Sequence, residues 1–279
     1  MFRGFYTAAS GMIAQQRRAE MLANNLANAN TPGFKAEQAS LRSFPEMLLQ
    51  QIGYERIPAE KRRYSPFHKT VGTVNTGVYM QEAIPNFVQG TLKETGLTTD
   101  MAIFDIRMPV NEENGLPGTV FFTVQTGEGE LRYTRNGSFT LDGQGYLTTA
   151  SGYYVLDADG NRIWLSSDRF VLRDDGFIEG ENGETALLGL SFSENPLLLI
   201  KEGDGLYRTD SGEPLPSAHG RGDVHFSVRQ KYLEQSNVDP GRTMVDLLAA
   251  YRTFEANQRV VRAYDSTMDK AANEVGRIR

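Results

Sequence analysis

The chain has 279 residues, of which 23% are charged and 39% hydrophobic, with no cysteine and three histidines. The absence of cysteine excludes disulfide scaffolds, thiolate metal sites and cysteine nucleophiles, and three scattered histidines leave little for histidine-based catalysis. The length predicts about two domains with a real hydrophobic core. No apolar run approaches the roughly 20 residues of a membrane-spanning helix, and the first residues lack the charged and apolar regions of a signal peptide.

The net charge of −6 is unevenly distributed along the chain. Residues 1–37 carry four basic and two acidic side chains, residues 228–279 carry nine and seven, and residues 38–227 carry 16 and 26. Binding to nucleic acid needs clustered positive charge that neutralises phosphates. The acidic middle therefore predicts no nucleic-acid partner.

The N-terminal residues show the periodicity of a long amphipathic helix. Apolar or small residues recur at alternating steps of three and four, with one polar member, at Phe5, Ala8, Met12, Gln15, Ala19, Leu22, Leu26 and Ala29. This spacing is that of a heptad seam. We expect the helix to end near Asn30–Gly33, because Pro32 lacks an N–H and disfavours helical geometry in Thr31.

Residues 37–90 are predicted to form an extended linker region. Phe44–Leu49 is a candidate short helix, and Pro58–Pro66 is expected to be a loop.

The middle of the chain is predicted to be a β-rich domain, at 91–227. Of the 28 glycines, 20 lie between Gly90 and Gly222. The segments Phe121–Gln125 and Arg132–Arg135 flank a Gly-Glu-Gly turn, as in a hairpin. Further turn signals, spaced too closely for βαβ units, occur at Asp142-Gly143, Asp159-Gly160, Asp175-Gly176 and Asn182-Gly183. An antiparallel domain follows from this spacing.

The C-terminal segment, 228–279, predicts a second helix of about 30 residues. Its seam steps by four and three through Leu247, Tyr251, Phe254, Gln258, Val261, Asp265, Met268, Ala272 and Val275. The helix start has two candidates, a capping box at Thr243–Asp246 and a first-turn proline at Pro240. Both seams contain small or polar residues, so the helices pack either on the chain's own β domain or against copies of themselves. Periodicity alone leaves both possibilities open.

The sequence contains no convincing catalytic or metal-binding arrangement. Asp157–Asn161 lacks the spacing of an EF-hand loop and is interpreted as a turn. There is no Gly-x-Ser-x-Gly elbow, and Asp174 and Asp175 are neighbours in a predicted turn, where their side chains point apart. We therefore expect no enzyme, no cofactor, no metal and no small-molecule substrate.

Three groups of motifs resemble those of the bacterial flagellar basal-body rod and hook-basal body protein family. They are Ala8–Met12 with Ala23–Lys35 at the N-terminus, Leu233–Asp239 with Tyr251–Gln258 at the C-terminus, and Tyr133–Phe139 with Gly145–Leu147 in the middle. Length and the middle motifs are most similar to distal or proximal rod proteins or their Gram-positive relatives. An extra stretch, Asn111–Gly118, departs from the usual pattern.

The resemblance implies an α+β fold in which long terminal helices form a coiled-coil-like axial core and the β-rich domain stands apart. It divides the chain into residues 1–36, 37–90, 91–227 and 228–279. It also implies a structural rod subunit that polymerises through its terminal helices into the axial tube carrying torque to hook and filament. The implied partners are copies of itself, other rod and hook subunits and the flagellar type III export apparatus, which would deliver it to the basal body without a cleavable signal peptide.

Under this interpretation the terminal helices supply the assembly interface. The apolar candidates are Phe5, Met12, Leu22, Leu26, Leu247, Tyr251, Phe254, Val261 and Met268. Asn24, Asn25, Asn28 and Asn30 are candidates for hydrogen bonds between subunits, with capping and solvation as equal alternatives. We also expect the terminal segments to be poorly ordered in the free chain and to fold on assembly.

The alternative from another class is an extracellular β-rich binding module or glycan-active protein whose helical ends serve oligomerisation. It would require two carboxylates facing each other across a pocket, roughly 5–10 Å apart.

Overall fold

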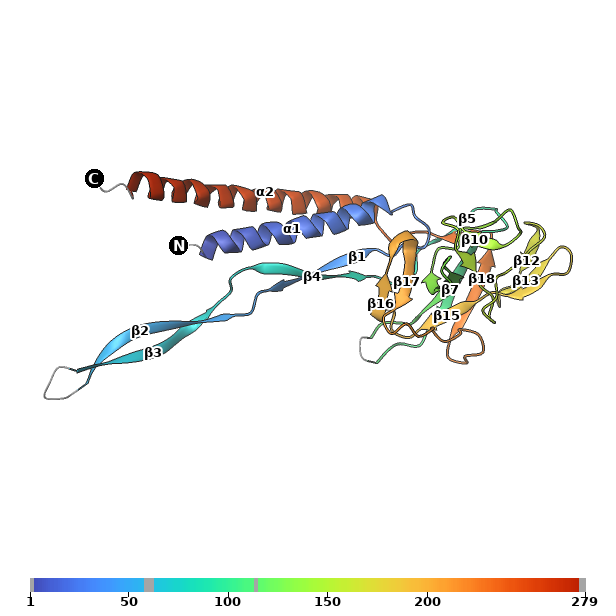
Figure 1. Cartoon of the computed structure of the whole chain (residues 1–279), viewed down its shortest axis with the longest axis horizontal. Helices are drawn as coiled ribbons and strands as arrows, with labels where there is room; N and C mark the ends of the chain where they lie inside the picture. The colour runs from blue at the N-terminus through green and yellow to red at the C-terminus, as the bar shows by residue number, and fades with distance from the viewer. Residues whose placement is uncertain (1–2, 58–62, 113–114, 276–279) are drawn as a thin grey trace. The chain divides into compact units, whose positions relative to one another are not determined.

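The computed structural model describes residues 3–57, 63–112 and 115–275 (Figure 1). It confirms the α+β class, with a helix near each end and a β-rich region between them. The chain divides into two compact units. Unit 1 comprises residues 1–24, 38–84 and 241–279, and unit 2 comprises residues 25–37 and 85–240. No helix within the described ranges has the length and apolar character needed to cross a membrane.

Two long helices occupy the ends of the chain. Helix α1 spans Arg3–Ala27 and helix α2 spans Pro240–Lys270, followed by a π-helical turn at Ala271–Val275. Of the two predicted starts for α2, the structure therefore has the proline start. Proline suits this position because the first N–H groups of a helix have no intrahelical partner.

Within unit 1, α1 and α2 run side by side in opposite directions (Figure 1). Gly4 lies directly against the Tyr264 ring, and a Cβ added at Gly11 would lie 3.0 Å from Asn257 Nδ2. The contacts advance by seven residues on α1 and retreat by seven on α2, as antiparallel helices with heptad-spaced contacts require. Glycine at both positions lets the two helices approach closely.

The predicted seam of α2 is half correct. Leu247, Phe254, Val261 and Met268 lie on the covered face of the helix. Of the alternate members, Gln258 is half-buried, whereas Tyr251 and Asp265 are exposed and the residues before them, Ala250 and Tyr264, are covered. Tyr264 and Asn257 are covered because they fill the space above Gly4 and Gly11. At the N-terminus, all eight predicted seam positions are buried or half-buried, seven of them on α1 and Ala29 in the turn that follows.

Two antiparallel ribbons follow α1 along the chain. Strand β1 (Glu37–Ser43) pairs with β4 (Val78–Pro85), and β2 (Met47–Ile57) pairs with β3 (Arg63–Val74). The predicted helix at Phe44–Leu49 is wrong, since β2 begins at Met47 and its long partner strand supplies the backbone hydrogen bonds. Of the predicted loop at 58–66, residues 58–62 lie outside the described residues and 63–66 belong to β3.

The first ribbon contacts α1 through polar groups inside unit 1. Thr7 Oγ1 donates to the carbonyl of Thr76 at 3.0 Å, and the amide of Val78 donates to Ser10 Oγ at 3.3 Å. Residues 38–84 belong to the same compact unit as residues 1–24 and 241–279, which hold most of both helices.

Unit 2 is built from short strands that pair antiparallel, as predicted. The main sheet has the order β16-β17-β8-β7-β11-β10-β9, with β15 also paired to β7. Its strands are β7 (Thr119–Gln125), β8 (Leu131–Thr134), β9 (Phe139–Leu141), β10 (Leu147–Thr149), β11 (Tyr154–Val155), β15 (Leu190–Ser193), β16 (Leu199–Lys201) and β17 (Leu206–Thr209). The predicted hairpin is β7–β8, with Thr123 opposite Tyr133.

Smaller sheets complete unit 2. One has the order β12-β13-β14, and two are the pairs β18-β6 and β19-β5. Their strands are β5 (Leu92–Glu94), β6 (Met101–Arg107), β12 (Phe170–Leu172), β13 (Phe177–Gly180), β14 (Thr185–Leu187), β18 (His225–Gln230) and β19 (Tyr232–Glu234). Two 3₁₀ turns, Pro196–Leu198 and Gly203–Gly205, flank β16. All four predicted Asp-Gly and Asn-Gly turns are present.

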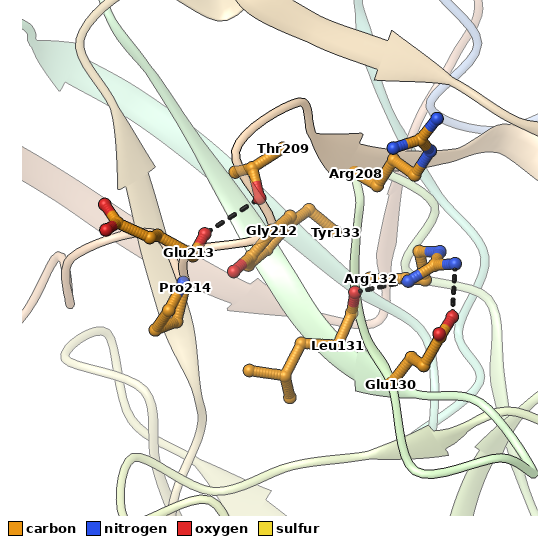
Figure 2. A pocket seen from close by; sticks show the side chains of 9 residues that line it. All are labelled: Glu130, Leu131, Arg132, Tyr133, Arg208, Thr209, Gly212, Glu213 and Pro214. Carbon is orange, nitrogen blue, oxygen red and sulfur yellow. Dashed lines mark hydrogen bonds and ion pairs between the residues drawn. The ribbon is translucent and has the colours of Figure 1, made fainter.

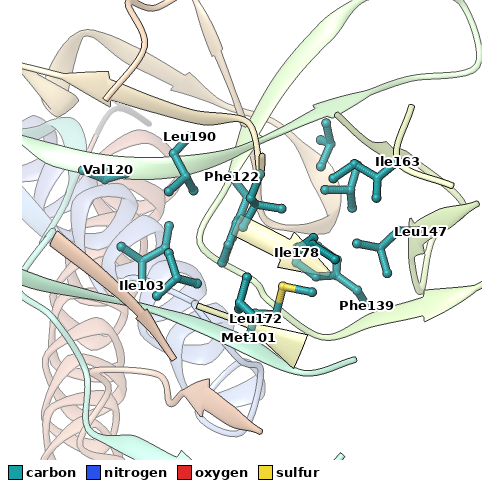
Figure 3. Close-up of a cluster of buried hydrophobic side chains, with 14 of the residues drawn as sticks. Met101, Ile103, Val120, Phe122, Phe139, Leu147, Ile163, Leu172, Ile178 and Leu190 are labelled. Atoms are coloured by element: carbon teal, nitrogen blue, oxygen red, sulfur yellow. The ribbon is translucent and has the colours of Figure 1, made fainter. Parts of the chain in front are cut away.

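The main hydrophobic core lies inside unit 2 (Figure 3). Phe122 of β7 packs edge-to-face on Phe139 of β9, with ring centroids 5.1 Å apart. Met101 and Ile103 of β6 and Ile178 of β13 close the cluster, so residues from several sheets share one core. Burial of such side chains stabilises each by about 1.5–3 kcal/mol. Unit 2 therefore contains its own core.

Candidate assembly surfaces

The predicted apolar interface residues take different positions in the chain. Leu22 and Leu247 are buried, and the helix register places them at the same level of unit 1. Tyr251 is exposed. The half-buried members are Phe5, Met12, Leu26, Phe254, Val261 and Met268. Most of the predicted residues are thus partly covered inside one chain, and each retains accessible area.

A second apolar surface on α2 shares Tyr251 with the predicted seam and adds two residues that the seam does not contain. Met244, Leu248 and Tyr251 follow each other at steps of four and three, so they lie on one face of the helix, and we call them the α2 stripe. Their side chains are 46%, 47% and 50% exposed. A search for apolar residues spaced by three and four on the face next to the seam would have revealed this stripe from the sequence.

Helix α1 has a comparable exposed pair. Tyr6 and Ile13 are separated by seven residues, which places them on the same face, and Ile13 is 50% exposed. Contiguous exposed apolar residues on helices are typical of protein interaction surfaces.

The β2–β3 ribbon also exposes apolar side chains. Met47, Leu48 and Ile52 of β2 and Val71 of β3 are all more than half exposed. Met47 and Leu48 are adjacent, so their side chains point to opposite faces of the ribbon. A two-stranded ribbon is marginally stable on its own, which makes this segment a further candidate for contact with another molecule.

Three of the four predicted asparagines have interactions within the chain. Asn25 is buried in unit 2, where its Nδ2 donates to the Glu37 carbonyl at 2.8 Å and its Oδ1 accepts from the Glu37 amide at 3.0 Å. Asn28 Oδ1 accepts from Thr31 Oγ1 at 3.1 Å. Asn24 also interacts, while Asn30 is exposed at the turn after α1. The amide of Asn25 thus joins the helix end to the strand that follows it.

A buried ionic cluster in unit 2 joins the three groups of motifs, and the sequence did not predict it. Lys35 Nζ lies 2.6 Å from Glu234 Oε1, and Arg135 Nη2 lies 2.8 Å from Glu234 Oε2. Arg135 also pairs with Asp105 at 3.1 Å. Lys35, Arg135 and Glu234 come from the N-terminal, middle and C-terminal motifs. The cluster holds two positive and two negative charges, so it is neutral as a whole.

Burial and charge act against each other in this cluster. Burial alone would raise the pKa of the Glu234 carboxyl, but the charges of Arg135 and Lys35 and their hydrogen bonds lower it overall. Burial and the nearby charge of Arg135 lower the pKa of Lys35, and Glu234 offsets only part of that shift. The pKa of each partner therefore depends on the charge of the other, because both side chains are buried.

The structure explains why position 33 of the N-terminal motif is a glycine. Its φ is +69°, and an added Cβ would lie 2.5 Å from the backbone carbon of Arg135. Only glycine allows this approach without strain.

A cavity of about 410 Å³ lies over the β8–β17 part of the main sheet (Figure 2). Its arginines are already paired, since Arg132 binds Glu130 and Glu202 and Arg208 binds Glu202. Glu130 and Glu213 are its carboxylates, and Figure 2 shows Glu213 directed away from Glu130. The cavity therefore lacks the facing carboxylate pair that a glycan-active site requires.

A metal ion needs several His, Asp or Glu side chains close to one another. Among residues 3–57, 63–112 and 115–275, no three His, Asp or Glu side chains gather closely enough to hold a metal ion.

Family models match both ends and the middle of the chain. Residues 5–35 match the flagella basal body rod protein model, residues 116–185 match the flagellar hook protein FlgE/F/G D1 domain, and residues 229–274 match the flagellar basal body rod FlgEFG protein C-terminal model.

Individual relatives are similar over their full length. The chain is 44% identical to the flagellar hook-basal body complex protein FlhO of Bacillus subtilis, with all of both chains covered. It is 31% identical to the flagellar basal-body rod protein FlgG of Borreliella burgdorferi, covering 98% of each chain. It is also 31% identical to the rod protein FlgF of Caulobacter vibrioides, covering 100% of this chain and 98% of that protein. The chain belongs to the family of flagellar basal-body rod and hook-basal body proteins.

Proposed function

We propose that the protein is a structural, non-enzymatic subunit of the flagellar basal-body rod that polymerises through its terminal helices. Full-length similarity to rod and hook-basal body proteins supports the rod role. The observation that carries the polymerisation is the α2 stripe, because α2 already packs on α1 through positions such as Asn257 and Tyr264 and still exposes Met244, Leu248 and Tyr251 beside that contact.

In this proposal the partners are copies of the chain and the other rod and hook subunits. The two helices form a coiled-coil-like core of the axial tube, and the stripe, with Tyr6 and Ile13, meets neighbouring helices. Subunits placed head-to-tail around an open helical axis would bury the same patch in every copy. The subunit reaches the basal body through the flagellar type III export apparatus, and the tube that it forms transmits torque to hook and filament.

A pair of matched substitutions tests the proposal in living cells. Leu248→Asp puts a charge in the α2 stripe, and Val171→Asp puts the same charge on β12 of unit 2, where Val171 is 63% exposed. We expect L248D to abolish swimming and to be missing from purified basal bodies, while V171D swims normally.

The fluorescence of Trp164, the single tryptophan, reports whether unit 2 stays folded in both variants. Normal swimming by a strain that carries L248D would contradict the proposal.

A further inference from the structure

All connections between the two units leave unit 2 through a small set of segments. The chain passes from one unit to the other after residues 24, 37, 84 and 240. The parts of unit 2 next to these crossings are residues 25–37, 85–91 and 231–240, and we call them the junction segments.

Backbone and amide hydrogen bonds join the junction segments to each other. The Gly33 amide donates to the carbonyl of Glu234 at 2.8 Å, and the Gln235 amide donates to the carbonyl of Thr91 at 2.9 Å. Asn237 joins the three segments, since its Oδ1 accepts from the Ala36 amide at 2.7 Å and its Nδ2 donates to the carbonyl of Asn86 at 2.8 Å.

A single carboxylate lies at the centre of this network. Glu234 Oε1 accepts hydrogen bonds from Lys35 Nζ at 2.6 Å and from the Gly90 amide at 2.9 Å. Glu234 Oε2 accepts from Arg135 Nε at 2.9 Å, and Lys35 also donates to the Val88 carbonyl at 3.0 Å. Glu234 therefore touches a residue from each of the other two junction segments and Arg135, which directly follows strand β8.

The junction segments contribute little to the apolar core. The main cluster around Phe122 and Ile178 contains no residue of 25–37, 85–91 or 231–240 within the described chain. Phe87 of the junction segments packs against a smaller aromatic cluster that includes Phe121. The ring centroids of Phe87 and Phe121 lie 5.9 Å apart. Phe34 and Val238 are buried as well, so the attachment combines a few apolar contacts with a dense network of polar and ionic bonds.

We propose that Glu234 is a latch that holds the junction segments on unit 2 as one cooperative element, which opens before the core unfolds. Removing the charge leaves Lys35 and Arg135 facing only Asp105 in a buried site, and an uncompensated buried charge is strongly unfavourable. Opening this latch would free all four connections to unit 1 while the core around Phe122 stays intact. The junction segments would then unfold locally, with a free energy of opening below that of unfolding the whole of unit 2.

Amide hydrogen exchange on the full chain tests the latch with Glu234→Gln. The control is Glu202→Gln, which removes a carboxylate that pairs with Arg132 and Arg208 outside the junction segments. In E234Q we expect the amides of Gly33, Ala36, Gly90 and Gln235 to exchange about a hundredfold faster. Core amides such as Leu147 and Leu188 should stay slower to exchange than the junction amides in both the wild type and E234Q, and E202Q should leave the junction amides unchanged.

Two results would overturn the latch. One is unchanged exchange of the junction amides in E234Q, and the other is equal protection of junction and core amides in the wild type, which would mean that the protein opens only globally.

A second variant keeps the test valid if E234Q folds poorly. Lys35→Met combined with Glu234→Gln removes one charge of each sign and leaves Arg135 with Asp105. We expect the junction amides of the double variant to exchange at least about tenfold more slowly than those of E234Q. Junction amides that exchange as fast as in E234Q, or faster, would contradict the charge compensation. Neither readout uses motility, so the outcome is independent of the proposed rod function.

Discussion

Lys35 and Glu234 are 199 residues apart in the chain and form a 2.6 Å ion pair in which each side chain is 1% exposed. Lys35 follows the N-terminal helix motif, and Glu234 precedes the C-terminal helix. The pair therefore fixes the ends of both terminal motifs to the same point of unit 2. The charges of Lys35 and Glu234 therefore serve the fold of unit 2, because each partner is buried and compensates the charge of the other.

Acid should unfold the protein partly through Glu234. The pKa of this carboxyl is lower in the folded chain than in the unfolded chain, where it is about 4.3. The folded state then binds fewer protons, so the stabilisation is complete above pH 4.3 or so and is lost as the pH falls through the folded value. We expect the free energy of unfolding of the wild type to fall more steeply between pH 5 and pH 3 or so than that of E234Q.

Denaturant unfolding at several pH values measures this difference. At neutral pH the variant should be less stable by about 3–5 kcal/mol. Parallel pH profiles for the two proteins would show that Glu234 contributes nothing to the acid sensitivity.

Gly137 should tolerate no side chain. An added Cβ would collide with the carbonyl of Met101, whose amide also donates to the Gly137 carbonyl at 3.0 Å. We expect Gly137→Ala to lower the free energy of unfolding by about 3 kcal/mol. Gly143→Ala is the control, since its Cβ would meet open space, and its effect should stay within about 0.5 kcal/mol. Equal stability of the two variants would contradict the close approach.

The contact between α1 and α2 limits the size of the side chain that position 11 can carry. Gly11→Ala places a methyl group 3.0 Å from the flexible amide of Asn257 and improves helix propensity by about 1 kcal/mol, so cells should swim. Gly11→Leu exceeds the space between the helices and should abolish swimming and incorporation into basal bodies. Swimming assays and the protein content of purified basal bodies measure both variants. Incorporation of G11L at the wild-type level would show that the helices do not pack this way in the assembly.

The free chain should contain less helix than the 25 residues of α1 and the 31 of α2. Their exposed apolar residues, among them Tyr6 and Leu248, lack a covering partner in one chain, and isolated helices gain most of their stability from packing. Far-UV circular dichroism of dilute protein measures the helix content. Full helix content at the lowest concentration would contradict folding on assembly.

Local patterns in the sequence predicted much of this fold, and long-range contacts account for the rest. The β7–β8 hairpin follows from Gly127 and Gly129 between two β-branched and aromatic runs, because turn chemistry acts over a few residues. Tyr251 and Asp265 were placed on the wrong face of α2, because the covered positions depend on Gly4 and Gly11 at the other end of the chain. Spacing along one helix carries no information about its partner.

The ionic cluster in the junction segments likewise depends on contacts between distant residues, which the sequence does not reveal. Lys35, Arg135 and Glu234 each lie inside a recognisable motif, yet nothing in the sequence shows that they meet. The strand Met47–Ile57 was missed for a related reason, since its pairing with β3 is what makes it a strand. The α2 stripe, in contrast, was available from the sequence, because Met244, Leu248 and Tyr251 follow the helical period.

The central claim, assembly through the terminal helices, is tested most directly by the accessibility of one introduced thiol. The chain has no cysteine, so a maleimide reagent labels only the introduced residue. Leu248→Cys lies in the α2 stripe, and Val171→Cys lies on β12 of unit 2 as the control. The account predicts that Leu248→Cys reacts readily in the free chain and is protected in intact basal bodies, while Val171→Cys reacts in both. Labelling of Leu248→Cys in intact basal bodies as fast as in the free chain would contradict it.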